Sequence, residues 1–318
     1  MITKARRMRE LLAEGMIVSP GIFDGYSSRL VEKMGYQAAS VTGAGLSNSR
    51  LSQPDIGIMS LMENVEGCRH LVANITIPVM ADADTGYGNA VTVYHTVQHF
   101  EAIGVVGINI EDQVSPKRCG HMRGKDIISA REMAKKIEAA VHAKKDPDFI
   151  INARTDAIAI EGIEGAIERA KLYIAAGADM VYPDAIDSED QIRRFCDAVQ
   201  APVSINMGFG IRSRPTTPLM SVKRLAELGV KRVSFARMLP AAAIMAMRQA
   251  LEVLLDSVRT GTIHDRPDLL ASIEDITDLM GYDHINALEA KFGLPEDILA
   301  RYKSDKPDYV KRDGHANK

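Results

Sequence analysis

The stretch Ile77-Pro78-Val79-Met80-Ala81-Asp82-Ala83-Asp84 decides the fold, because an apolar run ends abruptly in two acidic residues. A second apolar run, residues 107–111, ends in the same way and continues as Glu111-Asp112-Gln113. Near-continuous apolar runs are typical of strands that are buried on both faces of a parallel sheet. Both segments therefore indicate buried parallel strands with polar side chains at their carboxyl ends.

Eight such runs alternate with longer amphipathic patterns along the chain. The predicted strands are residues 18–23, 38–42, 78–82, 107–111, 149–153, 180–182, 203–206 and 232–235. The predicted helices are residues 28–34, 61–74, 90–103, 130–143, 163–176, 189–198 and 222–228. Eight strand–helix units in this order predict an α/β protein, a (β/α)8 TIM-type barrel.

A helix-rich tail of about 80 residues follows the eighth predicted strand. We expect a catalytic barrel over residues 1–245 and an additional C-terminal helical extension over residues 246–318 that packs on a neighbouring subunit. The tail carries Leu, Ile and Met residues that need a partner surface. We therefore expect a homo-oligomer.

Charge and cysteine content limit the classes of partner. The 318 residues carry a formal net charge of -3, which gives no basic surface for nucleic acid. No uninterrupted apolar stretch reaches the roughly 18 residues of a membrane span. Three widely spaced cysteines argue against a disulfide framework and favour a reducing cytoplasm. We expect a cytoplasmic enzyme that binds neither nucleic acid nor membrane.

Polar side chains mark the ends of the predicted strands, where barrels of this kind hold their active sites. Asp82 and Asp84 lie two residues apart, so both carboxylates face the same way on extended chain. Together with Glu111 they predict an oxygen-rich site for Mg²⁺, with Mn²⁺ as a second possibility. Each acid alone is equally compatible with capping the next helix. Further polar residues at strand ends are Asp24, Thr42, Arg154, Asp184 and Asn206.

A thiol follows the second strand in the loop Lys117-Arg118-Cys119-Gly120-His121. This loop is not an apolar face, where an inert buried cysteine is expected. Three potentially cationic neighbours favour the thiolate, and carboxylates of a bound substrate would restore the protonated thiol. We interpret Cys119 as a proton donor in the filled site. Cys68 and Cys196 lie in helical patterns and are interpreted as structural.

These motifs resemble the isocitrate lyase/phosphoenolpyruvate mutase superfamily, and within it the short-chain acid lyases, methylisocitrate lyase and 2,3-dimethylmalate lyase. The segments that carry the resemblance are Thr42-Gly43-Ala44-Gly45, Gln53-Pro54-Asp55, Asp82-Ala83-Asp84-Thr85-Gly86-Tyr87-Gly88, Glu111-Asp112-Gln113, Lys117-Arg118-Cys119-Gly120-His121 and Ala153-Arg154-Thr155-Asp156-Ala157. The cysteine loop is the most specific of them, because mutase and hydrolase relatives lack it.

The resemblance implies a Mg²⁺-dependent lyase that cleaves a C–C bond of a 2-hydroxy di- or tricarboxylate. The products would be pyruvate and a second carboxylate, released first as an enolate. It also implies a tetramer that exchanges a C-terminal helix. The implied metal ligands are Asp82, Asp84 and Glu111. The implied catalytic residues are Cys119, Arg154, His121, Lys117 and Arg118. The implied substrate-binding residues are Thr42, Gly43, Ala44, Asp55, Asp184 and Asn206.

Three departures from the family pattern bear on the substrate. Ser40 stands where methylisocitrate lyases have a tyrosine, and Asp184 stands where they have a glutamate. After Asn206, a short Glu-containing turn is replaced by residues 207–218, which contain Arg212 and Arg214. Either these arginines meet an additional substrate anion, or they are solvated loop residues.

Other activities remain open. One is decarboxylation or hydrolysis of oxaloacetate-like acids, or phosphonate P–C mutase or hydrolase chemistry, on the same metal platform. Another is a barrel without activity that serves as a scaffold.

Overall fold

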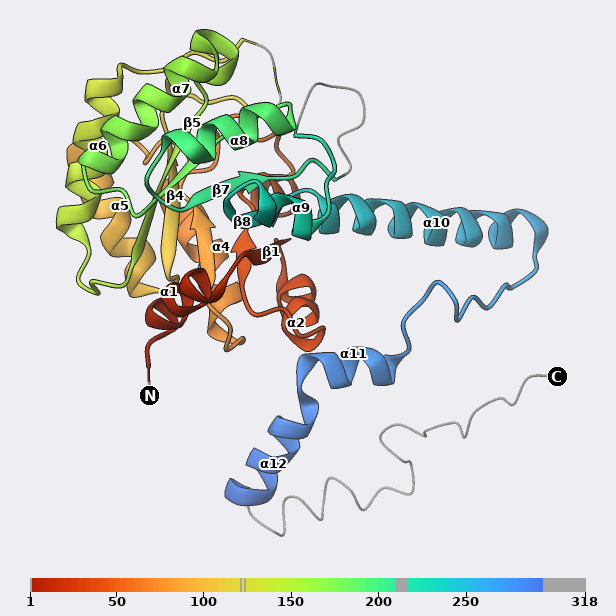
Figure 1. The fold of residues 1–318 in the computed structure, drawn as a ribbon. Coiled ribbons are helices and arrows are strands. Elements are labelled where there is room, and N and C mark those ends of the chain that lie inside the picture. Colours follow the sequence, from red (N-terminus) through yellow and green to blue (C-terminus); the bar gives the residue numbers. More distant parts are fainter. Residues whose placement is uncertain (1, 121, 123, 210–216, 294–318) are drawn as a thin grey trace. The chain divides into compact units, whose positions relative to one another are not determined.

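The computed structural model describes residues 2–120, 122, 124–209 and 217–293 (Figure 1). Eight parallel strands form a closed barrel in chain order, which confirms the predicted fold. The barrel closes where β1 pairs with β8, from Ile17 beside Arg232 to Pro20 beside Phe235. The strands are β1 Ile17–Ile22, β2 Ala39–Val41, β3 Val79–Asp82, β4 Gly107–Glu111, β5 Ile150–Thr155, β6 Met180–Pro183, β7 Val203–Asn206 and β8 Val230–Phe235.

Helices surround the strands, as Figure 1 shows. The seven predicted helices are present, within a few residues of their predicted bounds. They are α2 Gly25–Lys33, α4 Leu61–Ala73, α5 Ala90–Ala102, α6 Ala130–Ala143, α7 Ile158–Ala175, α8 Glu189–Ala198 and α9 Val222–Glu227, and α1 Lys4–Glu14 precedes β1.

One further helix, α3 Gly43–Leu51, was not among the predicted helices. Thr42 caps it, because its side chain accepts a hydrogen bond from the Gly45 amide at 3.2 Å. The cap gives one of the free amides of the first turn a partner, which offsets part of the helix-weakening effect of Gly43 and Gly45. The glycine-rich stretch therefore forms a helix N-terminus, directly after β2.

The two ends of the barrel differ in polarity. At the amino ends of the strands, Met8 and Leu11 of α1 pack with Ile17, Ile150 and Met180 in one apolar cluster. Polar side chains at this end include Arg9 and Asp179, which form an ion pair of 2.7 Å beside the cluster. The carboxyl ends instead carry buried charged side chains, among them Asp84, Glu111, Arg154 and Asp184. These buried charges make the carboxyl ends the candidate location of the active site.

The chain divides into two compact units, Met1–His264 and Asp265–Lys318. The first includes α10 Met238–Thr260, and the second includes α11 Ile273–Met280 and α12 Tyr282–Phe292. The boundary drawn from sequence between residues 245 and 246 falls inside α10. No residue of these three helices is buried. By length and composition α10 also suffices to cross a membrane, although Arg248 and Glu252 lie near its middle.

Asp112 joins β4 to its neighbours through a fully buried carboxylate. Its oxygens accept hydrogen bonds from the Thr155 hydroxyl at 2.7 Å, the Asp156 amide at 2.8 Å and the Tyr173 hydroxyl at 2.7 Å. Burial raises the pKa of Asp112, and the hydrogen bonds oppose that shift by stabilising the charged form. One carboxylate therefore fixes the start of the loop after β5 and one face of α7.

We predict that Asp112→Asn lowers the free energy of unfolding by about 3 kcal/mol. The amide lacks the negative charge, and its NH2 group would face groups that themselves donate hydrogen bonds to Asp112. Urea unfolding followed by circular dichroism measures the change. Asp190→Asn, an exposed acid on α8, is the control and should unfold like the wild type. Equal stability of the two variants would contradict a structural role for Asp112.

Candidate active site

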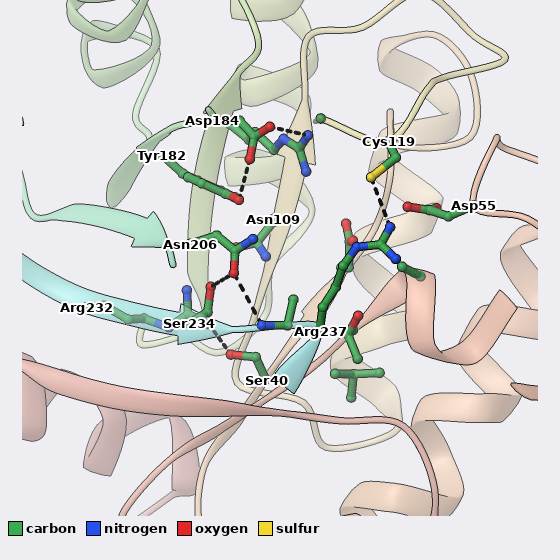
Figure 2. Close-up of a pocket in the computed structure, with 17 residues that line it drawn as sticks. Ser40, Asp55, Asn109, Cys119, Tyr182, Asp184, Asn206, Arg232, Ser234 and Arg237 are labelled. Atoms are coloured by element: carbon green, nitrogen blue, oxygen red, sulfur yellow. Dashed lines mark hydrogen bonds and ion pairs between the residues drawn. The ribbon is translucent and has the colours of Figure 1, made fainter. Parts of the chain in front are cut away.

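One cavity lies at the carboxyl ends of the strands, and Figure 2 shows the side chains that line it. It encloses about 620 Å³ of empty space, its open mouth included. Eight of the predicted site residues line it: Thr42, Ala44, Asp55, Asp82, Cys119, Arg154, Asp184 and Asn206. Residues that were not predicted also line it, chiefly Asn109, Tyr182, Arg232, Ser234 and Arg237.

The other predicted site residues do not line this cavity. Asp84, Glu111 and Lys117 are buried beside it, whereas the side chain of Arg118 is exposed. Gly43 lies against Asp82, since a Cβ at position 43 would come within 2.8 Å of Asp82 Oδ2. His121, Arg212 and Arg214 lie outside the described residues, so their predicted roles stay predictions.

Lys117 is the cation among the acids Asp55, Asp82, Asp84 and Glu111, which form the carboxylate side of the site. Its buried ammonium pairs with Asp84 Oδ1 at 2.9 Å and with the carboxylate of Asp55. Burial by itself lowers the pKa of Lys117, but Asp84, Glu111 and Asp55 outweigh burial and raise the pKa well above its usual value. Burial raises the pKa of the Asp84 carboxyl to about 6, with Lys117 opposing that shift. The ammonium therefore stays charged among acids that burial disfavours as anions.

The donor set on this side fits a divalent cation. Glu111 is buried, its Oε2 pairs with Arg154 Nη1 at 3.1 Å, and its Oε1 has no hydrogen-bond partner. In the described ranges, no three acidic, His or Cys side chains lie close enough to hold an ion unaided. Mg²⁺ needs no such set, because it keeps several waters and takes one or two carboxylates directly. Asp82, Asp84 and Glu111 therefore suit a water-rich magnesium site.

Arg154, at the end of β5, is held by three carboxylates. Its Nη1 pairs with Glu111 at 3.1 Å, its Nη2 with Asp184 at 3.1 Å and its Nε with Asp156 at 2.8 Å. Although burial opposes it, the charge of Arg154 and that of Lys125 hold the pKa of Asp156 below its usual range. The predicted pairing of Arg154 with a substrate carboxylate would have to compete with these partners.

Tyr182 lies beneath Arg154, whose guanidinium carbon is 5.3 Å from the centre of the phenol ring. Its hydroxyl donates a hydrogen bond of 2.6 Å to Asp184 Oδ1. Burial and the neighbouring carboxylate raise the pKa of Tyr182 well above its usual value. The phenol therefore keeps its proton and orients Asp184, whose second oxygen faces Arg154.

Cys119 reaches the mouth of the cavity, where its Sγ accepts a hydrogen bond from Arg237 Nη2 at 3.0 Å (Figure 2). The predicted cationic neighbours are placed differently: Lys117 pairs with acids, and the Arg118 side chain is exposed. Arg237 directly precedes α10 and was missed, although its place two residues after β8 marks it as a rim residue. The cation beside the thiol thus comes from the segment after β8, 118 positions further along the chain.

The cysteine loop is positioned by its backbone. Gln113 accepts from the Arg118 amide and donates to the Arg118 carbonyl, both at 2.9 Å. Gly120 lies so near Asp184 and Arg154 that a Cβ at position 120 would overlap the Asp184 carboxylate. The loop is therefore held by the Gln113 side-chain amide at Arg118, and its close approach to Asp184 requires glycine at position 120.

The other two cysteines are placed as predicted for structural residues. Cys68 is buried on α4, and Cys196 is partly buried on α8. Burial raises the pKa of both thiols, that of Cys196 to about 12. Neither lines the cavity, so Cys119 is the cysteine available for chemistry there.

Comparison with known proteins identifies a matching family and relatives of this chain. The family described as phosphoenolpyruvate phosphomutase matches residues 8–255. A 2-methylisocitrate lyase of Aeropyrum pernix is 39% identical over 303 residues, which cover 94% of each chain. A 2,3-dimethylmalate lyase of Eubacterium barkeri is 38% identical over 91% of this chain and 98% of its own.

Solved structures agree with these relatives. Oxaloacetate acetylhydrolase in complex with the inhibitor 3,3-difluorooxalacetate superposes with a TM-score of 0.83 at 30% identity, covering 91% of this chain and 97% of its own. Proteins of this superfamily use a divalent metal, in keeping with the carboxylates around Asp82. With the closed barrel and the relatives in agreement, the chain belongs to the phosphoenolpyruvate mutase/isocitrate lyase superfamily.

Proposed function

We propose that this protein is a Mg²⁺-dependent carbon–carbon lyase. Its substrate would be a 2-hydroxy di- or tricarboxylate of the 2,3-dimethylmalate or 2-methylisocitrate kind, cleaved into pyruvate and a carboxylate. The observation that carries the proposal is that Cys119 and Asp82 line one cavity. A proton donor and a metal-type carboxylate are the two groups that such a cleavage needs. The names of the relatives at 38–39% identity support the same reaction class.

The keto-acid half would bind at the start of α3 and beside the acids. Backbone amides of Gly43 and Ala44 lie in the first turn of that helix, where amides and the helix dipole attract a carboxylate. Thr42 holds this turn in place through its cap. When bound, Mg²⁺ supplies positive charge that stabilises oxygens of this half. Asp82 and Asp84, with Glu111 through water, would hold it.

Cleavage would pass the proton of the substrate hydroxyl to a carboxylate of the site and break the neighbouring C–C bond. The hydroxyl carbon becomes the carbonyl of pyruvate, and the bonding electrons pass to the other fragment as an enolate. Cys119 would donate its Sγ proton to the enolate carbon. The resulting thiolate would be stabilised by the Arg237 guanidinium, which contacts Sγ at 3.0 Å.

A second candidate is hydrolysis or decarboxylation of an oxaloacetate-like acid. The superposition with oxaloacetate acetylhydrolase favours it, because that enzyme shares the whole barrel. Decarboxylation that leaves a metal-bound enolate has less need of the Cys119 thiol, so this activity would be indifferent to Cys119→Ser. The phosphonate mutase and hydrolase reactions would differ from the lyase in the same respect.

We also propose that the enzyme works as a homo-oligomer, a tetramer, in the cytoplasm, without nucleic-acid or membrane partners. Support for the oligomer comes from α10, whose exposed Ile244, Met247, Leu251, Leu255 and Val258 recur at helical spacing on one face. An apolar stripe of this length needs a partner, and a second copy of the chain is the partner proposed. Three free cysteines fit a reducing compartment.

Pyruvate release tests the reaction. We predict Mg²⁺-dependent pyruvate from 2-methylisocitrate or 2,3-dimethylmalate, and a loss of 10²–10⁴ in kcat (an order-of-magnitude estimate) for Cys119→Ser, since a hydroxyl is a far weaker acid. Citramalate and oxaloacetate complete the panel, and Cys196→Ser is the matched control. Pyruvate release from oxaloacetate alone, unchanged in Cys119→Ser, would establish decarboxylation in place of the lyase reaction, and oxalate release would indicate hydrolysis.

Metal binding tests the carboxylate side. We predict that Asp82→Asn weakens Mn²⁺ binding, followed by electron paramagnetic resonance, and lowers Mg²⁺-dependent activity, because the site loses one anionic oxygen donor. Asp190→Asn serves as the control. Residual activity in Asp82→Asn with an unchanged Mg²⁺ requirement would place the metal elsewhere.

Association tests the role of α10. We predict that Leu251→Glu with Leu255→Glu lowers the mass seen by light scattering, because two charges interrupt the apolar stripe. Gln249→Glu, on the opposite side of the same helix by its spacing, should leave the mass unchanged. An oligomer that survives the double substitution would have to use another surface.

A further inference from the structure

The cations of the cavity fall into two groups with different partners. Arg154, which lines the cavity, and Lys117, which is buried beside it, are each paired with two or more carboxylates. Arg232 and Arg237 line the same cavity, yet in the described part of the chain no carboxylate pairs with either of them. Positive charge without a counter-charge therefore lies along the β8 side.

Arg232 is the more demanding of the two, because it is 1% exposed. Its Nη1 donates to the Ser204 hydroxyl at 2.9 Å and its Nη2 to the Ser40 hydroxyl, while its Nε has no partner. Burial lowers the pKa of Arg232 to about 10, so the side chain remains a cation at neutral pH. A buried cation held only by hydroxyl groups is costly, and proteins normally pair such a charge.

Small polar side chains surround the guanidinium of Arg232. Figure 2 shows its guanidinium reaching toward Ser40 from β8, with Ser234 and Asn206 on the same side of the cavity. Ser40 is short, so the guanidinium occupies space that a large side chain at position 40 would fill. Asn206 Oδ1 accepts from Ser234 and from the Ala236 amide, which fixes this wall.

We propose that Arg232 is a specificity-determining residue that binds a carboxylate on the departing half of the substrate. The substrate class is then a 2-hydroxy tricarboxylate, and the departing fragment is a dicarboxylate. Arg237, at the mouth, adds positive charge to the same subsite. This assignment rests on the proposed lyase reaction, which defines the departing half of the substrate. The anion site at Arg232 does not depend on that reaction.

Among the described residues, no carboxylate forms an ion pair with Arg232. Arg154 shows how this protein treats a buried guanidinium that it uses for structure, with carboxylates on three sides. Arg232 instead lines the cavity with a buried Nε that has no partner, while two hydroxyl contacts hold the plane of its guanidinium. A planar guanidinium held in this way is suited to a carboxylate.

Calorimetric titration of the Mg²⁺-loaded enzyme with succinate and with propionate tests the proposal. The two probes differ by one carboxylate, and neither is turned over. We expect wild type to bind succinate at least about tenfold more tightly than propionate, since a hydrogen-bonded charge pair is worth about that factor. Equal affinity for the two acids in wild type would overturn the proposal, whatever the variants do.

Variants assign the preference to the residue. Arg232→Met should lose the succinate preference and leave propionate binding unchanged, Arg232→Lys should keep part of it, and the exposed Arg131→Met should behave as wild type. A preference that persists in Arg232→Met would also overturn the proposal. Thermal unfolding accompanies each variant, and if Arg232→Met does not fold, Arg232→Lys carries the test. Because binding is measured without turnover, failure of the lyase reaction in the pyruvate assay would be seen separately.

Discussion

The guanidinium of Arg154 ties the rim of the barrel together. It draws Glu111 from the end of β4, Asp156 from beyond β5 and Asp184 from beyond β6 onto one cation. Without that charge, three buried acids would repel one another in a medium of low dielectric. Gly120 of the cysteine loop then seats against the resulting Arg154–Asp184 pair. The position of the thiol therefore depends on an ion cluster that never touches its sulfur.

The motif Glu111-Asp112-Gln113 shows how three successive polar residues divide structural and chemical tasks. Glu111 faces the acids of the site, Asp112 ties β4 to β5 and α7, and Gln113 clamps the backbone at Arg118. The sequence analysis quoted these residues as one motif and gave a role to Glu111 alone. Only Glu111 points to the chemistry, whereas its two neighbours build the frame around it.

Much of the fold follows from the sequence because strand burial and helix periodicity are local properties. The ends of β4 and β7 and the rim position of Asp82 are of this kind. What could not be predicted depends on contacts across the barrel. Arg232 reads as one polar residue in a strand until Ser40 and Ser204 are seen beside it, and Arg237 meets Cys119 across 118 positions of chain. The helix at Gly43 was hidden for another reason, since its cap at Thr42 outweighs the glycine propensity.

The side-chain amide of Gln113 holds the cysteine loop at main-chain atoms of Arg118. An amide that grips a peptide group is indifferent to the side chain that the peptide carries. The residue at position 118 can therefore diverge during evolution without moving the thiol that follows it. Side chains on the loop surface can then change during adaptation to a new substrate, while Cys119 Sγ keeps its position.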